Sequence, residues 1–307
     1  MRHILIILSL FLFSLTIISC SEKEESSTTP TTSSGLYVAV GYTGTILTST
    51  DGTTWTSRTS GTSNNLWAHS SGNGVSIIVG DNGTILTSTD GTTWTSRTSG
   101  TSNYLAGVTY GNSTFVTVGE SGIILTSSDG ISWDNRTSGI SKWIDAPIYK
   151  NSTFMTIGQD GVILTSTDGT TWTSRTSGTS NDFYDVTYGN STFVAVGDSG
   201  QIFTSSDGTS WDNRTSGTTN DLTGVDYGNS TFVAVGMNGT ILSSADGITW
   251  TSRTSGTTVG FTGFDYGNSI FVAVGFSGLI STSTDGITWT ARTSGTSIQL
   301  TGVDYKE

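Results

Sequence analysis

Apolar and polar positions along the chain repeat with a period of 39 residues. In one repeat, Leu222 to Tyr227 is half apolar and Phe232 to Gly236 is almost continuously apolar, whereas Thr240 to Ser244 and Trp250 to Thr254 mix the two kinds. Gly-Asn-Ser, Asn-Gly and Asp-Gly separate these segments, and such residues are typical of tight turns. Short segments of this kind predict strands, so each repeat is expected to form a four-stranded antiparallel meander.

Seven tryptophans mark the repeats, because each closes a copy of Ser-x-Asp-Gly-x-x-Trp. They are Trp55, Trp94, Trp133, Trp172, Trp211, Trp250 and Trp289. A four-stranded unit of about 40 residues, repeated seven times without a helical pattern, is typical of a propeller blade. We therefore predict an all-β fold, a seven-bladed β-propeller over residues 35–307.

The two ends of this region begin and finish in the middle of a repeat. Leu36 to Gly41 matches a second strand, and Leu300 to Tyr305 matches a first strand. We expect these segments to pair, so that one blade combines three N-terminal strands with one C-terminal strand. Such closure removes the exposed sheet edges that promote aggregation.

The segments Ser49 to Trp55 and Ser88 to Trp94 resemble the Asp box of sialidases and related BNR-repeat propellers, shortened by one residue between Asp and Trp. Gly44 to Leu47, running into Asp51-Gly52 and Trp55, also resembles repeats of the Ycf48-like family of photosystem assembly factors. Both resemblances imply a structural role for the repeated Trp and Asp, in which Asp caps a turn and Trp packs between sheets. The seven aspartates are Asp51, Asp90, Asp129, Asp168, Asp207, Asp246 and Asp285.

The N-terminus has the pattern of an export signal. Met1 to His3 is a short basic start, and Ile4 to Ile18 is an apolar run that is too short to span a bilayer. The run ends in Ile17-Ile18-Ser19-Cys20, which resembles the lipobox of bacterial lipoproteins. We expect residues 1–19 to be a signal peptide, residues 20–34 a lipidated flexible tether on Cys20, and the domain to be anchored in the bacterial cell envelope, at the outer membrane or cell surface.

Composition excludes several classes of function. The formal charge of −12, from 24 acidic and 12 basic residues, argues against binding to nucleic acid. Cys20 is the single cysteine and His69 the only histidine after residue 34, so neither a disulfide framework nor a cysteine or histidine metal site is expected. We expect no cofactor and no catalytic residues, and we interpret His69 as structural.

The seven repeats differ mainly in two windows, the connection from outer to next inner strand and the turn between second and third strands. In a propeller both windows open on one end of the ring, which we call the diversified face. Loops on a rigid scaffold commonly carry recognition, and aromatic rings among carboxylates suit a sugar or a peptide. The candidate ligand-binding residues are Trp67, Tyr104, Glu120, Trp143, Asp145, Asp182, Tyr184, Asp185 and Asp198.

These observations favour a monomeric, non-enzymatic binding or scaffold propeller that recognises a glycan, peptide or protein on the diversified face. Two other functions stay open: an assembly factor for a membrane protein complex, as the Ycf48-like resemblance implies, and a glycoside hydrolase using carboxylates of the same face. The variation is also open to a plainer interpretation, in which loops drift in a recently amplified repeat.

Overall fold

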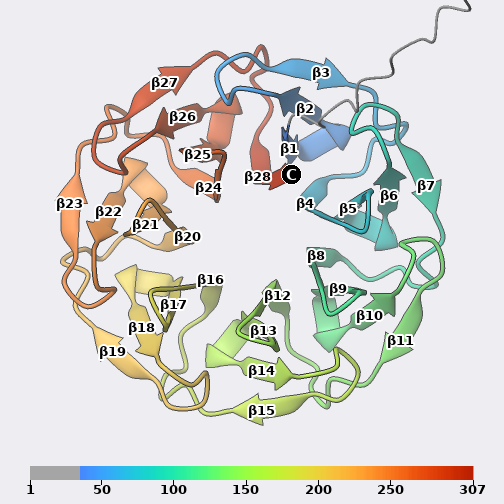
Figure 1. The fold of residues 1–307 in the computed structure, drawn as a ribbon, viewed down its shortest axis with the longest axis horizontal. Coiled ribbons are helices and arrows are strands. Elements are labelled where there is room, and N and C mark those ends of the chain that lie inside the picture. Colours follow the sequence, from blue (N-terminus) through green and yellow to red (C-terminus); the bar gives the residue numbers. More distant parts are fainter. Residues whose placement is uncertain (1–34, 307) are drawn as a thin grey trace, which may run out of the picture. The chain divides into compact units, whose positions relative to one another are not determined.

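The computed structural model describes residues 35–306, which form seven four-stranded antiparallel sheets arranged in a ring (Figure 1). This confirms the predicted seven-bladed β-propeller. We number the blades along the chain: blade 1 is β28-β1-β2-β3, and blades 2 to 7 are β4–β7, β8–β11, β12–β15, β16–β19, β20–β23 and β24–β27, each written from the channel outwards.

The four strands of a blade have fixed places from the central channel to the rim. The innermost strands are β28 (Leu300–Lys306), β4 (Leu66–Gly72), β8 (Leu105–Gly111), β12 (Ile144–Lys150), β16 (Phe183–Gly189), β20 (Leu222–Gly228) and β24 (Phe261–Gly267). The second strands are β1 (Leu36–Gly41), β5 (Val75–Gly80), β9 (Thr114–Gly119), β13 (Thr153–Gly158), β17 (Thr192–Gly197), β21 (Thr231–Gly236) and β25 (Ile270–Gly275).

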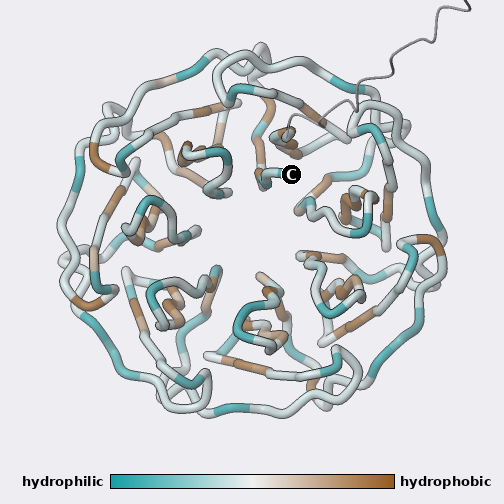
Figure 2. The backbone as a smooth tube through the Cα atoms, in the orientation of Figure 1, coloured by the Kyte–Doolittle hydropathy of each residue, from teal (hydrophilic) through white to brown (hydrophobic). Residues whose placement is uncertain are grey.

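The outer half of each blade is shorter. The third strands are β2 (Ile46–Ser49), β6 (Ile85–Ser88), β10 (Ile124–Ser127), β14 (Ile163–Ser166), β18 (Ile202–Ser205), β22 (Ile241–Ser244) and β26 (Ile280–Ser283). The outermost strands are β3 (Thr56–Arg58), β7 (Thr95–Arg97), β11 (Asp134–Arg136), β15 (Thr173–Arg175), β19 (Asp212–Arg214), β23 (Thr251–Arg253) and β27 (Thr290–Arg292). Figure 2 shows hydrophilic stretches on this outermost circle and apolar residues on the strands inside it.

A one-turn 3-10 element joins the second strand of each blade to the third. These elements are η1 (Tyr42–Gly44), η2 (Asp81–Gly83), η3 (Glu120–Gly122), η4 (Gln159–Gly161), η5 (Asp198–Gly200), η6 (Met237–Gly239) and η7 (Phe276–Gly278). The last residue of each is a glycine with φ between 65° and 73°, a conformation that side-chain-bearing residues adopt at a cost. The backbone conformation therefore requires glycine at the last position of each 3-10 element, while the residue at the first position can vary.

Ring closure follows the predicted register. The last strand, β28, pairs antiparallel with β1, and Leu36 lies opposite Lys306 while Ala39 lies opposite Val303. The Oγ1 of Thr301 in β28 also donates hydrogen bonds to the carbonyls of Val40 and Leu66, so the same strand joins blade 1 to blade 2. The end of the chain thus completes the blade that its beginning starts.

The core of the ring consists of seven separate apolar layers, one at each contact between neighbouring blades. The layer between blades 5 and 6 combines Val194 and Ile202 of one blade with Leu222, Phe232 and Leu242 of the next, all buried. Equivalent layers lie at the other six contacts. Each blade is therefore buried on both faces, which accounts for the almost continuous apolar run of the second strand.

The repeated Asp lies in the turn before the outermost strand of each blade, and the repeated Trp lies next to that strand. Trp250 is half-buried and packs against the layer between blades 5 and 6. The carboxylate of Asp246 accepts hydrogen bonds from the N–H groups of Ile248 and Thr249 and from the hydroxyl of Ser244. Hydrogen bonds from Thr249 and Ile248 hold the pKa of Asp246 below its ordinary value, so the carboxylate is a cap for this turn.

The predicted signal peptide, tether and lipid-attachment cysteine, Cys20, lie outside the described residues and stay predictions. Within residues 35–306, no helix is long and apolar enough to cross a membrane.

We predict that removing the ring of one fully buried aromatic residue from an inter-blade layer lowers the stability of the whole domain. Phe232→Ala should lower the free energy of unfolding by about 3–5 kcal/mol, because the lost contacts leave a cavity between two blades. Ile248→Ala, at a side chain that is 49% exposed, is the control and should change it by less than about 0.5 kcal/mol. Guanidinium denaturation followed by tryptophan fluorescence measures both, and equal effects of the two variants would contradict the layered core.

Candidate functional site

The two variable windows lie on one end of the ring, as predicted. In every blade, the first residue of the 3-10 element donates a backbone hydrogen bond to a carbonyl in the connection that enters the inner strand; Asp81 donates to Asn65 over 2.9 Å, and Asp198 to Asp182 over 3.0 Å. The other five pairs are Tyr42 with Gln299, Glu120 with Tyr104, Gln159 with Trp143, Met237 with Asp221, and Phe276 with Gly260. The diversified face is therefore one continuous surface around the channel.

A cavity of about 310 Å³ occupies the channel entrance on this face, and all seven innermost strands contribute to its wall. We call it the mouth cavity. Four of the candidate residues line it together: Trp67, Asp145, Tyr184 and Asp185. They come from blades 2, 4 and 5, so the chain brings side chains from distant repeats to one place.

The wall of the mouth cavity has two different halves at the second position of the innermost strands. In blades 6, 7 and 1 this position holds Thr223, Thr262 and Thr301. Each hydroxyl donates a hydrogen bond to a backbone carbonyl at the start of the next blade. The distance is 2.9 Å from Thr223 to Phe261 and 2.6 Å from Thr301 to Leu66. In blades 2 to 5 the position holds Trp67, Ala106, Asp145 and Tyr184. These four side chains form no such bond to the next blade within the described residues.

Two of the large side chains are held in place by carboxylates of their own blades. The Trp67 indole N–H donates to Asp81, and the Tyr184 hydroxyl donates to Asp198. The Trp67 ring also meets the edge of Tyr42, with ring centroids 5.7 Å apart. A hydrogen bond at the polar end of each ring orients its apolar face, which is the usual arrangement of aromatic contact residues.

The remaining candidate residues lie on the surrounding loops and do not line the mouth cavity. Tyr104 and Trp143 form an aromatic pair with centroids 5.9 Å apart. The carboxylates of Glu120 and Asp182 hold backbone: Glu120 accepts from the N–H of Tyr104, and Asp182 accepts from the N–H of Asp160 over 2.8 Å. Glu120 and Asp182 therefore support the loops that carry the rings.

Asp145 begins a distorted segment of the cavity wall. Ala146 has a φ of 44°, an uncommon conformation for alanine, and the pairing of β12 with β13 shifts between Asp145 and Ile148, around Pro147. The Asp145 carboxylate accepts from the Ala146 N–H over 2.7 Å. Burial raises the pKa of Asp145 to about 6, although hydrogen bonds from Ala146 and Trp143 oppose the shift. Backbone strain of this kind is concentrated at binding sites in other proteins.

A series of carboxylates joins the innermost strands, and of its members Asp185 alone was among the predicted site residues. The backbone N–H groups of the next blade donate to Asp185 over 2.8 Å, and to Asp226 and Asp265 over 2.9 Å. The innermost strand is a sheet edge with unpaired N–H groups, so these aspartates supply acceptors that a neighbouring strand would otherwise provide. For Asp226 and Asp265 the signal in the sequence was the Asp-Tyr pair, which recurs at Asp304-Tyr305, but the N–H group that each carboxylate binds lies 40 residues further along the chain.

Burial and mutual repulsion disfavour ionisation of these carboxyls. Burial raises the pKa of Asp265 well above its ordinary value, and the charges of Asp304 and Asp226 add to the shift. Burial likewise raises the pKa of Asp185 and of Asp226. Each of these carboxyls is therefore harder to ionise than an exposed aspartate.

His69 completes this series at the ring closure. Its Nδ1 lies 2.8 Å from the carboxylate of Asp304, which belongs to β28, and the ring meets Trp94 edge-on at 6.1 Å. The His69 side chain is fully buried. It joins blade 2 to blade 1, which is the structural role expected from the sequence.

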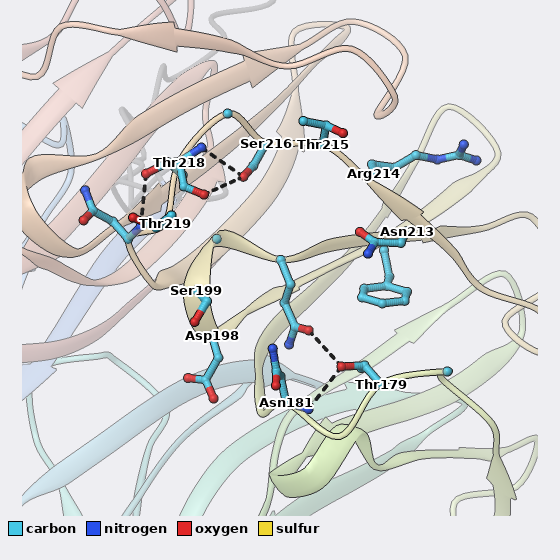
Figure 3. A pocket seen from close by; sticks show the side chains of 16 residues that line it. Thr179, Asn181, Asp198, Ser199, Asn213, Arg214, Thr215, Ser216, Thr218 and Thr219 are labelled. Carbon is cyan, nitrogen blue, oxygen red and sulfur yellow. Dashed lines mark hydrogen bonds between the residues drawn. The ribbon is translucent and has the colours of Figure 1, made fainter.

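A larger hollow of about 810 Å³ lies on the outer rim of blade 5, where Asn181, Asp198, Asn213 and Arg214 surround it (Figure 3). Similar grooves occur on blades 2 and 3. The groove follows from the repeat itself, so it is a weaker candidate for a specific site than the mouth cavity. Each repeated arginine is held within its own blade: Arg214 Nε donates to Thr204 over 2.8 Å, and the equivalent bond occurs in all seven blades.

We predict that Asp145→Asn makes the domain more stable at neutral pH. Because the folded state raises the pKa of Asp145 from 3.8 to about 6, its protonated form favours folding below pH 4 and this contribution is lost as the pH rises through 6. The neutral amide has no ionisation cost, so the variant should gain on the order of 2 kcal/mol between pH 4 and pH 8 relative to the unchanged chain. Asp134→Asn, at a carboxylate that is 74% exposed, is the control in the same denaturation series. An unchanged pH profile in Asp145→Asn would contradict the burial of this carboxyl.

No family model matches the chain, and no curated protein matches it. Among solved structures, it is similar to one described as YCF48 bound to D1 peptide, with a TM-score of 0.61 and 22% identity over 74% of this chain and 80% of that one. YCF48 from Cyanidioschyzon merolae has a TM-score of 0.61 and 15% identity, over 76% and 87% of the two chains. The computationally designed Ika8 protein has a TM-score of 0.65 and 14% identity, over 88% and 87%. The chain therefore has the fold of the YCF48 propellers, in agreement with one sequence resemblance, while the Asp-box resemblance to sialidases stays a prediction.

Proposed function

We propose that this protein is a non-enzymatic binding propeller that recognises a segment of another protein at the mouth cavity. The observation that carries the proposal is the asymmetry of the cavity wall. Blades 6, 7 and 1 keep the threonine that bonds to the next blade, whereas Trp67, Asp145 and Tyr184 replace it in blades 2, 4 and 5. Each replacement gives up a contact that stabilises the ring, so drift in unconstrained loops accounts poorly for it.

The form of the site favours a peptide over a glycan. The mouth cavity has a wall of aromatic rings and apolar strand residues, with carboxyls between them, and this composition suits side chains of an extended peptide. One structure of similar fold is described as YCF48 bound to D1 peptide, which is a precedent for a propeller of this kind holding a peptide. A glycan is the alternative ligand, and binding assays separate the two.

The carboxyls of the mouth are poorly arranged for glycoside hydrolysis. That reaction needs two carboxyls directed at one substrate. Both oxygens of Asp185 already accept backbone hydrogen bonds, from Val186 and Val225. Asp145 is then the one carboxyl of the cavity wall whose second oxygen accepts no backbone hydrogen bond within the described residues, which supports a binding role.

A second candidate function is that of an assembly factor for a membrane protein complex. The similarity in fold to YCF48 favours it, and the predicted lipid anchor at Cys20 would hold the propeller at a membrane of the bacterial envelope. In this case the bound segment belongs to a membrane protein. Purification of the full chain from membranes should then bring that protein with it.

We predict that residues 35–307 bind members of a peptide array and that binding needs the aromatic residues of the diversified face. Changing Trp67, Trp143 and Tyr184 together to alanine should weaken binding at least tenfold, because the stacking surfaces are lost. The matched control changes Ile131, Ile248 and Ile287 to alanine, three exposed side chains in turns at the opposite end of the ring. This segment is suitable because all seven core layers lie within it.

A glycan array with the same proteins completes the experiment, and thermal unfolding verifies that each variant is folded. Binding to glycans and to no peptide would show that the ligand is a sugar and would overturn the proposal of a peptide ligand. Binding that survives in the folded triple-alanine variant would overturn the proposed site.

A further inference from the structure

A second kind of surface lies on the diversified face, over blades 6 and 7. The first position of the 3-10 elements is acidic in blades 2, 3 and 5, but holds Met237 in blade 6 and Phe276 in blade 7. Phe276 is 36% exposed, and Val259 in the neighbouring connection is also 36% exposed. We call Met237, Val259 and Phe276 the apolar patch.

Met237 and Phe276 of the apolar patch lie against each side of a buried glycine, Gly260. A Cβ atom built on Gly260 would lie 3.0 Å from the sulfur of Met237 and 3.2 Å from the ring of Phe276. Its backbone is in the ordinary range, and its carbonyl accepts from the Phe276 N–H over 3.2 Å. These distances are shorter than ordinary van der Waals contacts, so Met237 and Phe276 pack closely over Gly260 and leave no room for a side chain there.

One side of the apolar patch borders negative charge. Met237 donates its N–H to the carbonyl of Asp221, so this aspartate is the immediate neighbour of the patch. Its carboxylate accepts from the N–H of Ser199 in blade 5, next to Asp198. The acidic side chains continue to Asp182, whose N–H donates to the Asp198 carboxylate. Around blade 7 the adjoining residues of the face are Gln299 and Tyr42 in place of carboxylates.

This arrangement defines the chemistry of the partner. An anionic lipid surface would be repelled by the carboxylates, and a second copy of this chain, with a formal charge of −12, would be repelled as a whole. A segment with one apolar side and one basic side complements both parts of this surface. Its apolar side would lie on the apolar patch, and its basic side would face Asp221 and the acidic side chains of blade 5.

We infer that the partner of the diversified face is a basic, amphipathic protein segment, which packs apolar side chains on the exposed surface of the apolar patch and places a lysine or arginine beside Asp221. This inference rests on the proposed function and names the class of its ligand. The apolar contact supplies affinity, and the charges set the orientation of the segment and speed its association.

The test uses two synthetic 12-residue peptides on residues 35–307, one alternating leucine with lysine and the other alternating leucine with glutamate. Fluorescence anisotropy should detect binding of the lysine peptide and at least tenfold weaker binding of the glutamate peptide. Raising the salt concentration should weaken the first complex, because exposed charges are screened. Equal affinity for the two peptides would overturn the inference.

Three variants locate the contact. Phe276→Ser should weaken binding of the lysine peptide about tenfold, and Asp221→Asn, which keeps an oxygen that accepts from Ser199, about threefold at low salt. Ile287→Ser is the control, because this side chain is 48% exposed and lies on the same blade at the opposite end. Unchanged affinity in folded Phe276→Ser would overturn the inference.

The outcome is separable from that of the proposed function. If array peptides bind and the variant with Trp67, Trp143 and Tyr184 changed to alanine loses them, but Phe276→Ser and salt leave their affinity unchanged, the aromatic residues carry the site. The basic amphipathic partner is then wrong. If no array peptide binds and the lysine peptide does not bind, both proposals fail.

Discussion

The packing of each blade against the next is the interaction on which the rest of the structure depends. A single blade has two apolar faces and only four short strands, so it has no core of its own. Val194 and Phe232, for example, meet only because two successive blades lie side by side. All seven layers are needed to cover the fourteen faces of the blades, so the ring closes as one unit. Each blade is then held in place by the side chains of its two neighbours.

This packing leaves the innermost strands as a circle of sheet edges around the channel, and the way those edges are satisfied shapes the candidate site. Threonine hydroxyls and aspartate carboxylates reach from one blade to the backbone of the next in blades 5, 6, 7 and 1. Blades 2 to 4 lack most of these links and carry the larger side chains instead. Links to the next blade and candidate recognition residues therefore lie mostly in different sectors of the circle, and blade 5 has both, because Asp185 forms a link beside Tyr184.

Much of the fold was predictable from sequence because its signals are local. The Asp-Gly turn, the tryptophan that follows it and the apolar second strand recur in every repeat, and they fixed the number of blades, the strand order and the pairing of β28 with β1. The inter-blade links were not predictable in the same way. Asp226 looks like any polar residue of an inner strand until the backbone N–H of Tyr266, 40 positions along, is placed beside it. The candidate residues fall into two groups that the sequence could not separate, because their contacts lie in distant parts of the chain. Trp67 and Tyr184 line the mouth cavity, whereas Glu120 and Asp182 bind the backbone of loops.

The closing strand also constrains when the domain can form. Leu300–Lys306 supply the inner edge of the blade that Leu36–Gly41 begin, so a ribosome must release almost the entire chain before blade 1 is complete. Until then β1 is paired on one side only, with β2, and the apolar layer around Tyr37 and Ala39 is incomplete. If residues 1–19 direct export as predicted, blade 1 stays incomplete while the chain crosses the membrane, and Leu300–Lys306 complete it afterwards.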